Sequence, residues 1–292
     1  MIRGAIVAIV TPFRDGKVDE EALRRLIEEQ IACGTDGIAP CGTTGESTTL
    51  SHEEHDRVIE MTVEAVNKRV PVIAGTGSNS TAEAIRLTKH AWQAGVDAAL
   101  IVCPYYNRPT QEGLYLHYRA IAEEVPIPII VYNIAGRTGV NMSTETLARL
   151  AQLPNIVGVK EASGSLKQMS DVIRLCGPDF TVLSGDDIFT LALMAMGGQG
   201  VISVISNVVP GDMAAMVDAF AAGDLAKAQA LHHRMTPLID ALFIETNPIP
   251  VKAALAMMGK IAYDLRLPLC RMGEKNEAAL RGVMQQYGLI KA

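Results

Sequence analysis

The stretch Pro128–Ala162 reads PIIVYNIAGRTGVNMSTETLARLAQLPNIVGVKEA, and it indicates the fold of the whole chain. It begins with one short apolar run, Pro128–Ile134, and ends with another, Ile156–Ala162, with a helix-like segment between them. Both runs are almost continuously apolar rather than alternating, which is typical of parallel strands covered on both faces. We therefore predict a strand, a helix and a second parallel strand.

The same pattern recurs on both sides of this stretch. Signals for helix starts lie between the runs: Asp19 can cap a helix that ends near Gly34, and Ser51-x-x-Glu54 and Ser80-x-x-Glu83 have the spacing of capping boxes. The other six apolar runs are Ala5–Val10, Gly37–Cys41, Pro71–Thr76, Ala98–Pro104, Thr181–Asp186 and Gly200–Ser206. Eight strand–helix units in a row predict a (β/α)8 TIM barrel of the α/β class. A doubly wound open sheet stays open as an alternative, because periodicity does not show closure.

The chain continues beyond what an eighth unit needs. Residues after about Gly223 have helical patterns near Asp224–Phe243, Pro248–Met258 and Lys275–Tyr287. We therefore expect a barrel domain over residues 1–223 and a C-terminal helical extension over residues 224–292.

Composition excludes several classes of protein. Of 292 residues, 49% are hydrophobic and 20% are charged, so the chain is not disordered. The net charge of -6 argues against a nucleic-acid-binding protein. No apolar stretch is long enough to span a bilayer, and the run Ala5–Val10 is too short for a signal peptide. The five scattered cysteines form no Cys-x-x-Cys pair, so we expect a reducing, cytoplasmic environment.

Lys160 is the most informative residue of the chain, since it alone among the lysines lies inside a strand-like apolar run. Gly158 and Lys160 are two apart and therefore face the same side of their strand. If that side is the barrel interior, desolvation lowers the pKa of the amine, which can then attack a ketone and form a Schiff base. The competing interpretation is a lysine that reaches water at the strand end or pairs with a carboxylate.

Polar residues gather where the predicted strands end, which is where a TIM barrel places its active site. The turn Gly42-Thr-Thr-Gly-Glu46 offers backbone N–H groups and two hydroxyls for a carboxylate, although such glycines are often purely structural. Tyr105, Tyr106 and Tyr132 can relay protons or simply pack at the rim. Arg137 can clamp a substrate carboxylate or form a surface ion pair.

Other chemistries lack their motifs. His52-Glu-Glu-His55 places its histidines three apart instead of the four that a helical zinc motif needs, so no metal site is expected. No Gly-x-Ser-x-Gly sequence supplies the nucleophile of an α/β-hydrolase.

Taken together and in order, several of these motifs resemble the dihydrodipicolinate synthase family of class I, pyruvate-dependent aldolases. The resemblance covers essentially the whole chain. The matching segments are Ala5–Phe13, Gly42–Glu46, Pro104–Pro109, Tyr132-Asn133, Arg137–Gly139, Gly158–Glu161, Leu183–Asp186 and Asn247–Lys252.

The resemblance implies a reaction and a role for each site residue. Lys160 would form a Schiff base with pyruvate, and Arg137 would hold the carboxylate of L-aspartate 4-semialdehyde. Thr43 and Thr44 would bind the pyruvate carboxylate, with Gly185 and Ile202 lining its pocket through backbone groups. A proton relay would comprise Thr44, Tyr132 and Tyr106, the last contributed by a neighbouring subunit. The product, 4-hydroxy-tetrahydrodipicolinate, would feed lysine and diaminopimelate biosynthesis, without an organic cofactor or a metal.

The resemblance also implies assembly and regulation. The family is usually a homotetramer, a dimer of dimers, and its inhibited members bind L-lysine in a cleft at a dimer interface. The matching positions here are Ser47, Thr48, His52, His55, Asn79, Glu83 and Tyr105.

Two alternatives remain. The chain could be another pyruvate-dependent aldolase, such as an N-acetylneuraminate lyase or a 2-keto-3-deoxy sugar acid aldolase, although relatives that cleave sugar acids generally lack an arginine at the position of Arg137. It could also be a non-catalytic barrel that senses a keto acid, which the set Lys160, Tyr132 and Thr44 argues against.

Overall fold

Eight parallel strands form a closed barrel in the computed structural model, which describes residues 2–291. The strands are β1 (Gly4–Ala8), β4 (Gly37–Ala39), β5 (Ile73–Gly75), β6 (Ala98–Val102), β7 (Ile129–Asn133), β8 (Ile156–Glu161), β9 (Thr181–Ser184) and β10 (Gly200–Ser203). Their order is β4-β1-β10-β9-β8-β7-β6-β5, and a parallel bridge between Ile38 and Val72 joins the two end strands. All eight predicted strands are confirmed, and the closure decides against an open sheet.

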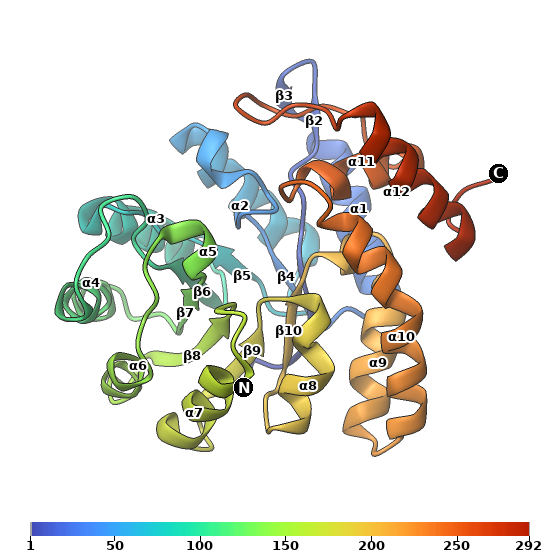
Figure 1. The fold of residues 1–292 in the computed structure, drawn as a ribbon. Helices are drawn as coiled ribbons and strands as arrows, with labels where there is room; N and C mark the ends of the chain where they lie inside the picture. Colours follow the sequence, from blue (N-terminus) through green and yellow to red (C-terminus); the bar gives the residue numbers. More distant parts are fainter. Residues whose placement is uncertain (1, 292) are drawn as a thin grey trace.

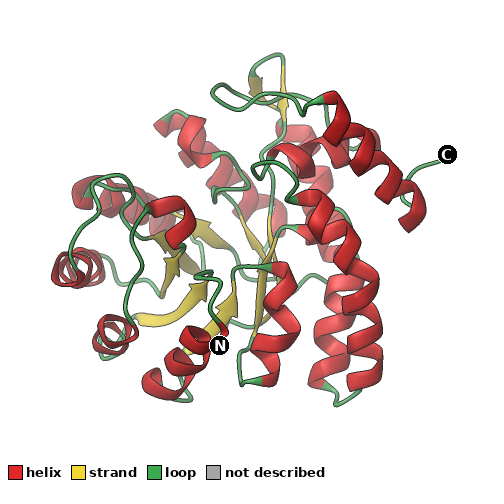
Figure 2. Ribbon diagram, viewed as in Figure 1, coloured by secondary structure: helices red, strands yellow, loops and turns green. Residues whose placement is uncertain are grey.

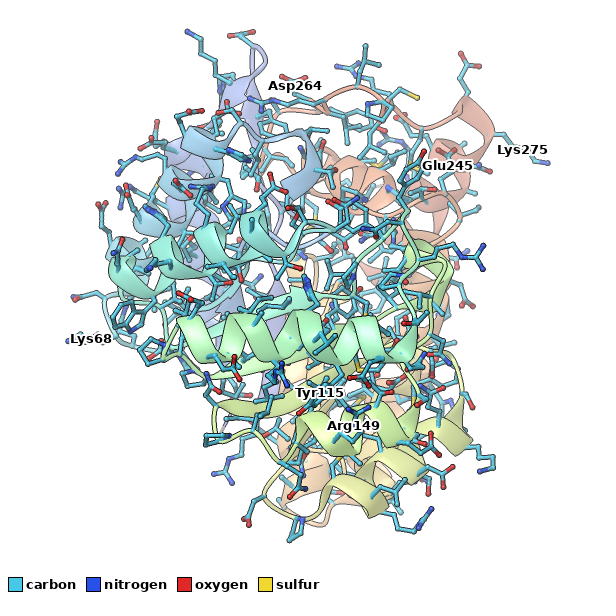
Figure 3. The ribbon with its side chains drawn as sticks, turned by 90° about the vertical axis from the view of Figure 1, so that its left-hand side faces the viewer. Lys68, Tyr115, Arg149, Glu245, Asp264 and Lys275 are labelled. Carbon is cyan, nitrogen blue, oxygen red and sulfur yellow. The ribbon has the colours of Figure 1, made fainter. Side chains whose placement is uncertain are left out.

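Helices surround the strands (Figures 1 and 2). Those that follow the barrel strands are α1 (Glu20–Ala32), α2 (His52–Val66), α3 (Thr81–Ala94), α4 (Gln111–Glu124), α5 (Ala135–Thr138), α6 (Thr144–Leu150), α7 (Leu166–Cys176), α8 (Thr190–Ala195) and α9 (Pro210–Ala221). Short 3-10 turns lie at Ser47–Thr49, Asp187–Phe189 and Ile205–Asn207. On the outer surface, the Arg149 guanidinium of α6 lies 4.0 Å from the centre of the Tyr115 ring of α4 (Figure 3).

The helix starts follow the predicted caps with one correction. Asp19 accepts from the N–H of Ala22, and Ser51 forms a complete capping box with Glu54. Ser80 caps α3, but the Glu83 carboxylate does not return to it; it accepts from the Ser78 hydroxyl and contacts His52 instead. The predicted second capping box is therefore wrong in its reciprocal half, because Ser78 offers Glu83 a competing donor.

Strand alternation divides the apolar residues into two cores. Inward-facing residues such as Ile6 and Ala8 fill the barrel, whereas their neighbours Ala5 and Val7 pack against the helices. Tyr132 belongs to the interior cluster, and it pairs in register with Lys160 on the adjacent strand. The period of two thus places the lysine inside the barrel mouth.

Three helices follow the barrel as predicted: α10 (Leu225–Leu242), α11 (Ile249–Met257) and α12 (Glu274–Tyr287). Helix α10 packs along α9, and α11 and α12 lie near a small hairpin of β2 (Phe13–Arg14) and β3 (Lys17–Val18) that the sequence pattern did not reveal (Figure 1). The division at residue 223 stays a prediction. Within residues 2–291, no helix combines the length and apolar character needed to cross a membrane.

Candidate active site

Lys160 lies on β8 at the mouth of the barrel, with only 5% of its surface exposed. Its Nζ is 4.3 Å from the centre of the Tyr132 ring. Burial lowers the pKa of this amine from 10.5 to about 8, and the negative charges of Asp186 and Asp187 oppose the shift. A lysine with this pKa is partly neutral near pH 8 and therefore able to attack a carbonyl carbon. The interpretation of Lys160 as a solvated strand-end lysine is wrong.

Gly185 gives the lysine its space. A Cβ at this position would lie 2.6 Å from the Ala162 Cβ and 3.2 Å from the Lys160 Cε, so a side chain would displace its neighbours. Ile202 is fully buried on the inner face of β10. Both predicted lining residues therefore adjoin the barrel interior.

The turn Gly42–Glu46 follows β4. The residue just before it and its last residue have left-handed backbone conformations, although neither is glycine. Cys41 has φ 55° and Glu46 has φ 52°. Such conformations cost free energy and persist where surrounding contacts impose them, often at functional sites. Thr43 and Thr44 lie within this strained turn, and Thr43 lines the same cavity as Tyr132.

The structure gives the two threonines different partners. Burial raises the pKa of the Tyr132 phenol, while the charge of Arg137 and the neighbouring Thr43 side chain oppose that rise. The Thr44 Oγ1 instead accepts from the Asn247 Nδ2 at 3.0 Å. The relay of Thr44, Tyr132 and Tyr106 stays a prediction, and of the two threonines it is the Thr43 side chain that influences Tyr132.

Arg137 lies on the short helix α5, at the rim of the barrel. Its Nη2 donates to the Asn247 backbone oxygen at 3.0 Å, which joins the loop after β7 to the start of α11. Thr43, Tyr132, Arg137 and Asn247 all line one cavity of about 420 Å³. Four predicted residues do not line this cavity: Lys160, Thr44, Gly185 and Ile202. Lys160 is next to it through the ring of Tyr132.

Tyr106 does not reach this cavity within one chain. It follows β6 with φ 72°, and its side chain is 90% exposed. A hydroxyl in this position contacts an active site only when another molecule covers it.

The predicted regulatory residues adjoin the same cavity. Six of them are on its wall: Ser47, Thr48, His52, His55, Glu83 and Tyr105. Asn79 is not, and its Nδ2 donates to the Tyr105 backbone oxygen at 3.2 Å. The cavity is thus continuous from Arg137 and Tyr132 to this group.

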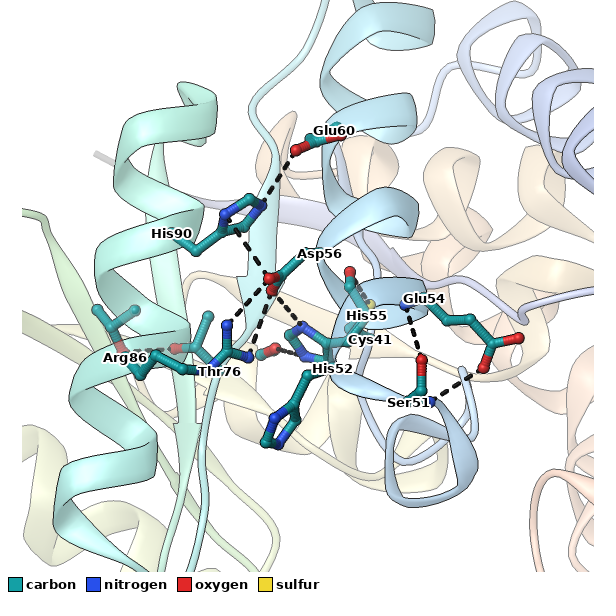
Figure 4. Close-up of polar contacts among 12 residues, drawn as sticks. Cys41, Ser51, His52, Glu54, His55, Asp56, Glu60, Thr76, Arg86 and His90 are labelled. Carbon is teal, nitrogen blue, oxygen red and sulfur yellow. Dashed lines mark hydrogen bonds and ion pairs between the residues drawn. The ribbon is translucent and has the colours of Figure 1, made fainter.

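The two histidines of α2 differ in their surroundings (Figure 4). His52 is partly exposed and its Nε2 lies 2.9 Å from the Glu83 carboxylate. His55 is buried, with its Nε2 2.9 Å from the Gly75 backbone oxygen, and burial lowers its pKa. Of the two histidines, His52 therefore lies on the solvent-exposed face of α2 and His55 on its buried face.

Sequence reasoning missed the residues that hold the Thr43-Thr44 turn to the C-terminal extension. The Lys252 Nζ of α11 lies 2.5 Å from the Glu46 carboxylate, and both side chains are fully buried. Arg266 also binds Glu46 through its backbone N–H at 3.2 Å. A lysine among the apolar residues of α11 was the available signal. Among residues 2–291, no group of His, Cys, Asp and Glu side chains is arranged to hold a metal ion.

The chain is similar over its whole length to proteins of one known family. A model of the dihydrodipicolinate synthetase family matches residues 1–287. The 4-hydroxy-tetrahydrodipicolinate synthase of Syntrophus aciditrophicus is 72% identical over 290 residues, which cover 99% of this chain and 100% of that protein. The enzyme of the same name from Thermodesulfovibrio yellowstonii is 60% identical, with 100% of both chains covered.

Solved structures show the same likeness. The crystal structure of dihydrodipicolinate synthase from Aquifex aeolicus has a TM-score of 0.98 and 49% identity, with 100% of each chain covered. A structure from Acinetobacter baumannii (TM-score 0.97, 49% identity, 99% and 100% coverage) is described as chloride-inhibited and complexed with pyruvate. One from Cyanidioschyzon merolae (0.96, 43%, 99% of each chain) is described with lysine bound.

Proposed function

This chain belongs to the dihydrodipicolinate synthetase family, and from that membership and its site we propose that it condenses pyruvate with L-aspartate 4-semialdehyde to give 4-hydroxy-tetrahydrodipicolinate. The reaction is a step of lysine and diaminopimelate biosynthesis. The buried Lys160 amine, with its pKa lowered to about 8, is the observation that carries the mechanism.

The chemistry follows from that amine. The neutral Lys160 nitrogen attacks the pyruvate ketone and water leaves, which gives an imine. The imine withdraws electrons, so a methyl proton leaves and an enamine forms. The enamine carbon then attacks the aldehyde of the second substrate, which restores the imine to Lys160. The amino group of that substrate attacks the imine carbon and displaces the Lys160 nitrogen, so the ring closes and the lysine is freed. The lysine itself supplies the electron sink, so no metal or organic cofactor is required.

Each proton transfer needs a hydroxyl close to the lysine, and the Tyr132 ring, whose centre is 4.3 Å from the Lys160 Nζ, supports a phenol in this role. We assign the relay to Thr43, Tyr132 and Tyr106, with Thr43 in place of Thr44 because of its contact with Tyr132. Thr44 then binds the pyruvate carboxylate, and Gly185 and Ile202 line the pyruvate pocket through their backbones.

Arg137 holds the carboxylate of the aldehyde substrate. The guanidinium lies on the wall of the cavity that Tyr132 also lines, and its planar donors suit a carboxylate. A cavity with a cation at this point favours an acidic aldehyde over the polyol chain of N-acetylneuraminate or a keto-deoxy sugar acid, so these alternatives are not favoured.

Tyr106 completes the relay from a neighbouring subunit, and the proposed assembly is a homotetramer. The 90% exposure of Tyr106 supports this, because the isolated chain leaves its hydroxyl away from the cavity. One related structure, 46% identical with a TM-score of 0.97 and 99% and 98% coverage, is described as a monomeric variant. Sedimentation at assay concentration tests the proposal: a fully active monomer contradicts it.

L-Lysine is proposed as a feedback inhibitor that binds at Ser47, Thr48, His52, His55, Asn79, Glu83 and Tyr105. The Glu83 carboxylate suits its ammonium, and the shared cavity connects six of these residues, all except Asn79, to Arg137 and Tyr132. A cytoplasmic location fits the five cysteines, all of which are free thiols.

Borohydride trapping tests the core of the function. Pyruvate and borohydride should add one reduced adduct to the wild-type chain, at Lys160. A coupled assay should then show turnover with pyruvate and L-aspartate 4-semialdehyde and none with N-acetylneuraminate. An adduct at Lys252, or no adduct, would contradict the proposal.

A further inference from the structure

Asn247 contacts both halves of the candidate site. It is the second residue before α11, and only 5% of its surface is exposed. Its side-chain Nδ2 donates to the Thr44 hydroxyl at 3.0 Å, and its backbone oxygen accepts from Arg137 at 3.0 Å. One residue of the C-terminal extension therefore touches the group assigned to pyruvate and the group assigned to the aldehyde.

The amide determines where the Thr44 proton goes. A hydroxyl has one proton, and a hydroxyl that already accepts from an amide N–H is left to donate that proton to a different acceptor. Within residues 2–291 the Thr44 hydroxyl donates to no acceptor, and both side chains are buried. The proton is therefore available to a carboxylate that enters the site.

The contacts of the Asn247 side chain indicate that it contributes little to the stability of the fold. Its Oδ1 is buried and has no hydrogen-bond partner in the described residues. A buried, unpaired carbonyl costs free energy that offsets the single hydrogen bond to Thr44. An apolar residue would avoid this cost, so the amide is better explained by what it does to Thr44.

Helix α11 holds Asn247 and the turn in a fixed relation. Five residues after Asn247, Lys252 pairs with Glu46 in the fully buried ion pair. The Glu46 backbone N–H in turn donates to the Thr43 oxygen at 3.1 Å. The turn is thus bound to α11 at two points, through Thr44 and through Glu46.

From these contacts we propose that Asn247 is a positioning residue for pyruvate. Its amide orients the Thr44 hydroxyl so that the proton points to the pyruvate carboxylate, while its backbone oxygen steadies Arg137. The inference rests on the proposed function and deepens it, because it assigns pyruvate selectivity to the C-terminal extension.

The test is the concentration of pyruvate that half-saturates borohydride trapping at Lys160. Asn247→Ala should raise it about tenfold, the order expected for one lost hydrogen bond to a charged ligand. Asn247→Asp should raise it further, because its carboxylate accepts the Thr44 proton and repels the anion. The KM for L-aspartate 4-semialdehyde should change less than about twofold, since the backbone oxygen that Arg137 uses is retained.

Two comparisons separate positioning from a structural role. In a Thr44→Val background, Asn247→Ala should add no further change, because the hydroxyl it orients is gone. Asn155 is the matched control: its Nδ2 donates to the backbone oxygens of Ala122, Val125 and Ile127, away from the site. Asn155→Ala should lower the free energy of unfolding and leave half-saturation unchanged.

Several results would overturn the inference. One is an unchanged half-saturating pyruvate concentration in Asn247→Ala. Another is an equal rise in that concentration and in the KM for L-aspartate 4-semialdehyde, together with a lower free energy of unfolding. A third is that Asn247→Ala raises the half-saturating concentration as much in the Thr44→Val background as in the wild type. The proposed function fails separately, if the wild-type chain traps no pyruvate at all.

Discussion

Replacing Lys160 with methionine should stabilise the fold while it abolishes the reaction. Burial lowers the pKa of this amine from 10.5 to about 8, and each unit corresponds to about 1.36 kcal/mol. Between these two pH values the unfolded chain binds more protons than the folded one, so stability rises with pH through this window. Below pH 8 the amine is protonated in both states, so the folded state carries the whole free-energy cost of burying that charge. Methionine removes it in a side chain of similar length.

The size of the effect depends on pH in a way that can be measured. The two pKa values give a gain for Lys160→Met of about 3 kcal/mol at pH 7 and about 1 kcal/mol at pH 9.5. These are upper values, because Lys160 also lowers the pKa of Asp186 and that carboxyl loses its partner. Urea unfolding at both pH values, at one protein concentration, measures the gap. A variant no more stable than wild type at pH 7, or a gap that widens with pH, would refute the reasoning.

Three other changes address the remaining groups. Arg137→Ala should keep imine formation with pyruvate but cost about 1.5–3 kcal/mol in kcat/KM for the aldehyde substrate, and an unchanged value in steady-state assays would contradict its role. Lys252→Ala leaves the Glu46 charge buried without a partner and should cost about 3–5 kcal/mol of unfolding free energy in urea titrations, whereas a loss below about 1 kcal/mol would show that water reaches the carboxylate. Glu83→Ala should weaken inhibition by L-lysine, because it removes the carboxylate that would bind the ligand's ammonium, and the neighbouring His52 cannot take its place. Calorimetry that detects no lysine binding to the wild-type protein would exclude the site.

The barrel could be predicted from the sequence because its signals are local. An apolar run of five or six residues becomes a strand wherever both faces are covered, and Asp19 and Ser51 cap helices through contacts within four residues. The same locality explains why the lysine of the run Ile156–Ala162 could be selected: period two alone puts Lys160 on the face of Gly158.

Contacts between distant segments could not be predicted in this way. The hydroxyl of Thr44 meets Asn247, 203 residues away, and Glu46 meets Lys252, 206 residues away. Nothing in the spacing of either segment indicates these pairs. The contact of Glu83 with Ser78 was missed for a different reason: it spans only five residues, but a competing donor in the preceding loop lies outside the capping pattern.

The sequence by itself determined the strand–helix alternation, the caps and the reactive lysine, because these depend on residues that are neighbours along the chain. Only the tertiary structure decided that the barrel closes through Ile38 and Val72 and that the amine is desolvated enough to lower its pKa to about 8. It also decided that α11 reaches back to hold the Thr43-Thr44 turn. Barrel closure, burial and hydrogen-bond geometry depend on which surfaces meet in space. Those surfaces come from segments that are distant in the sequence, so only their packing in the folded chain determines these features.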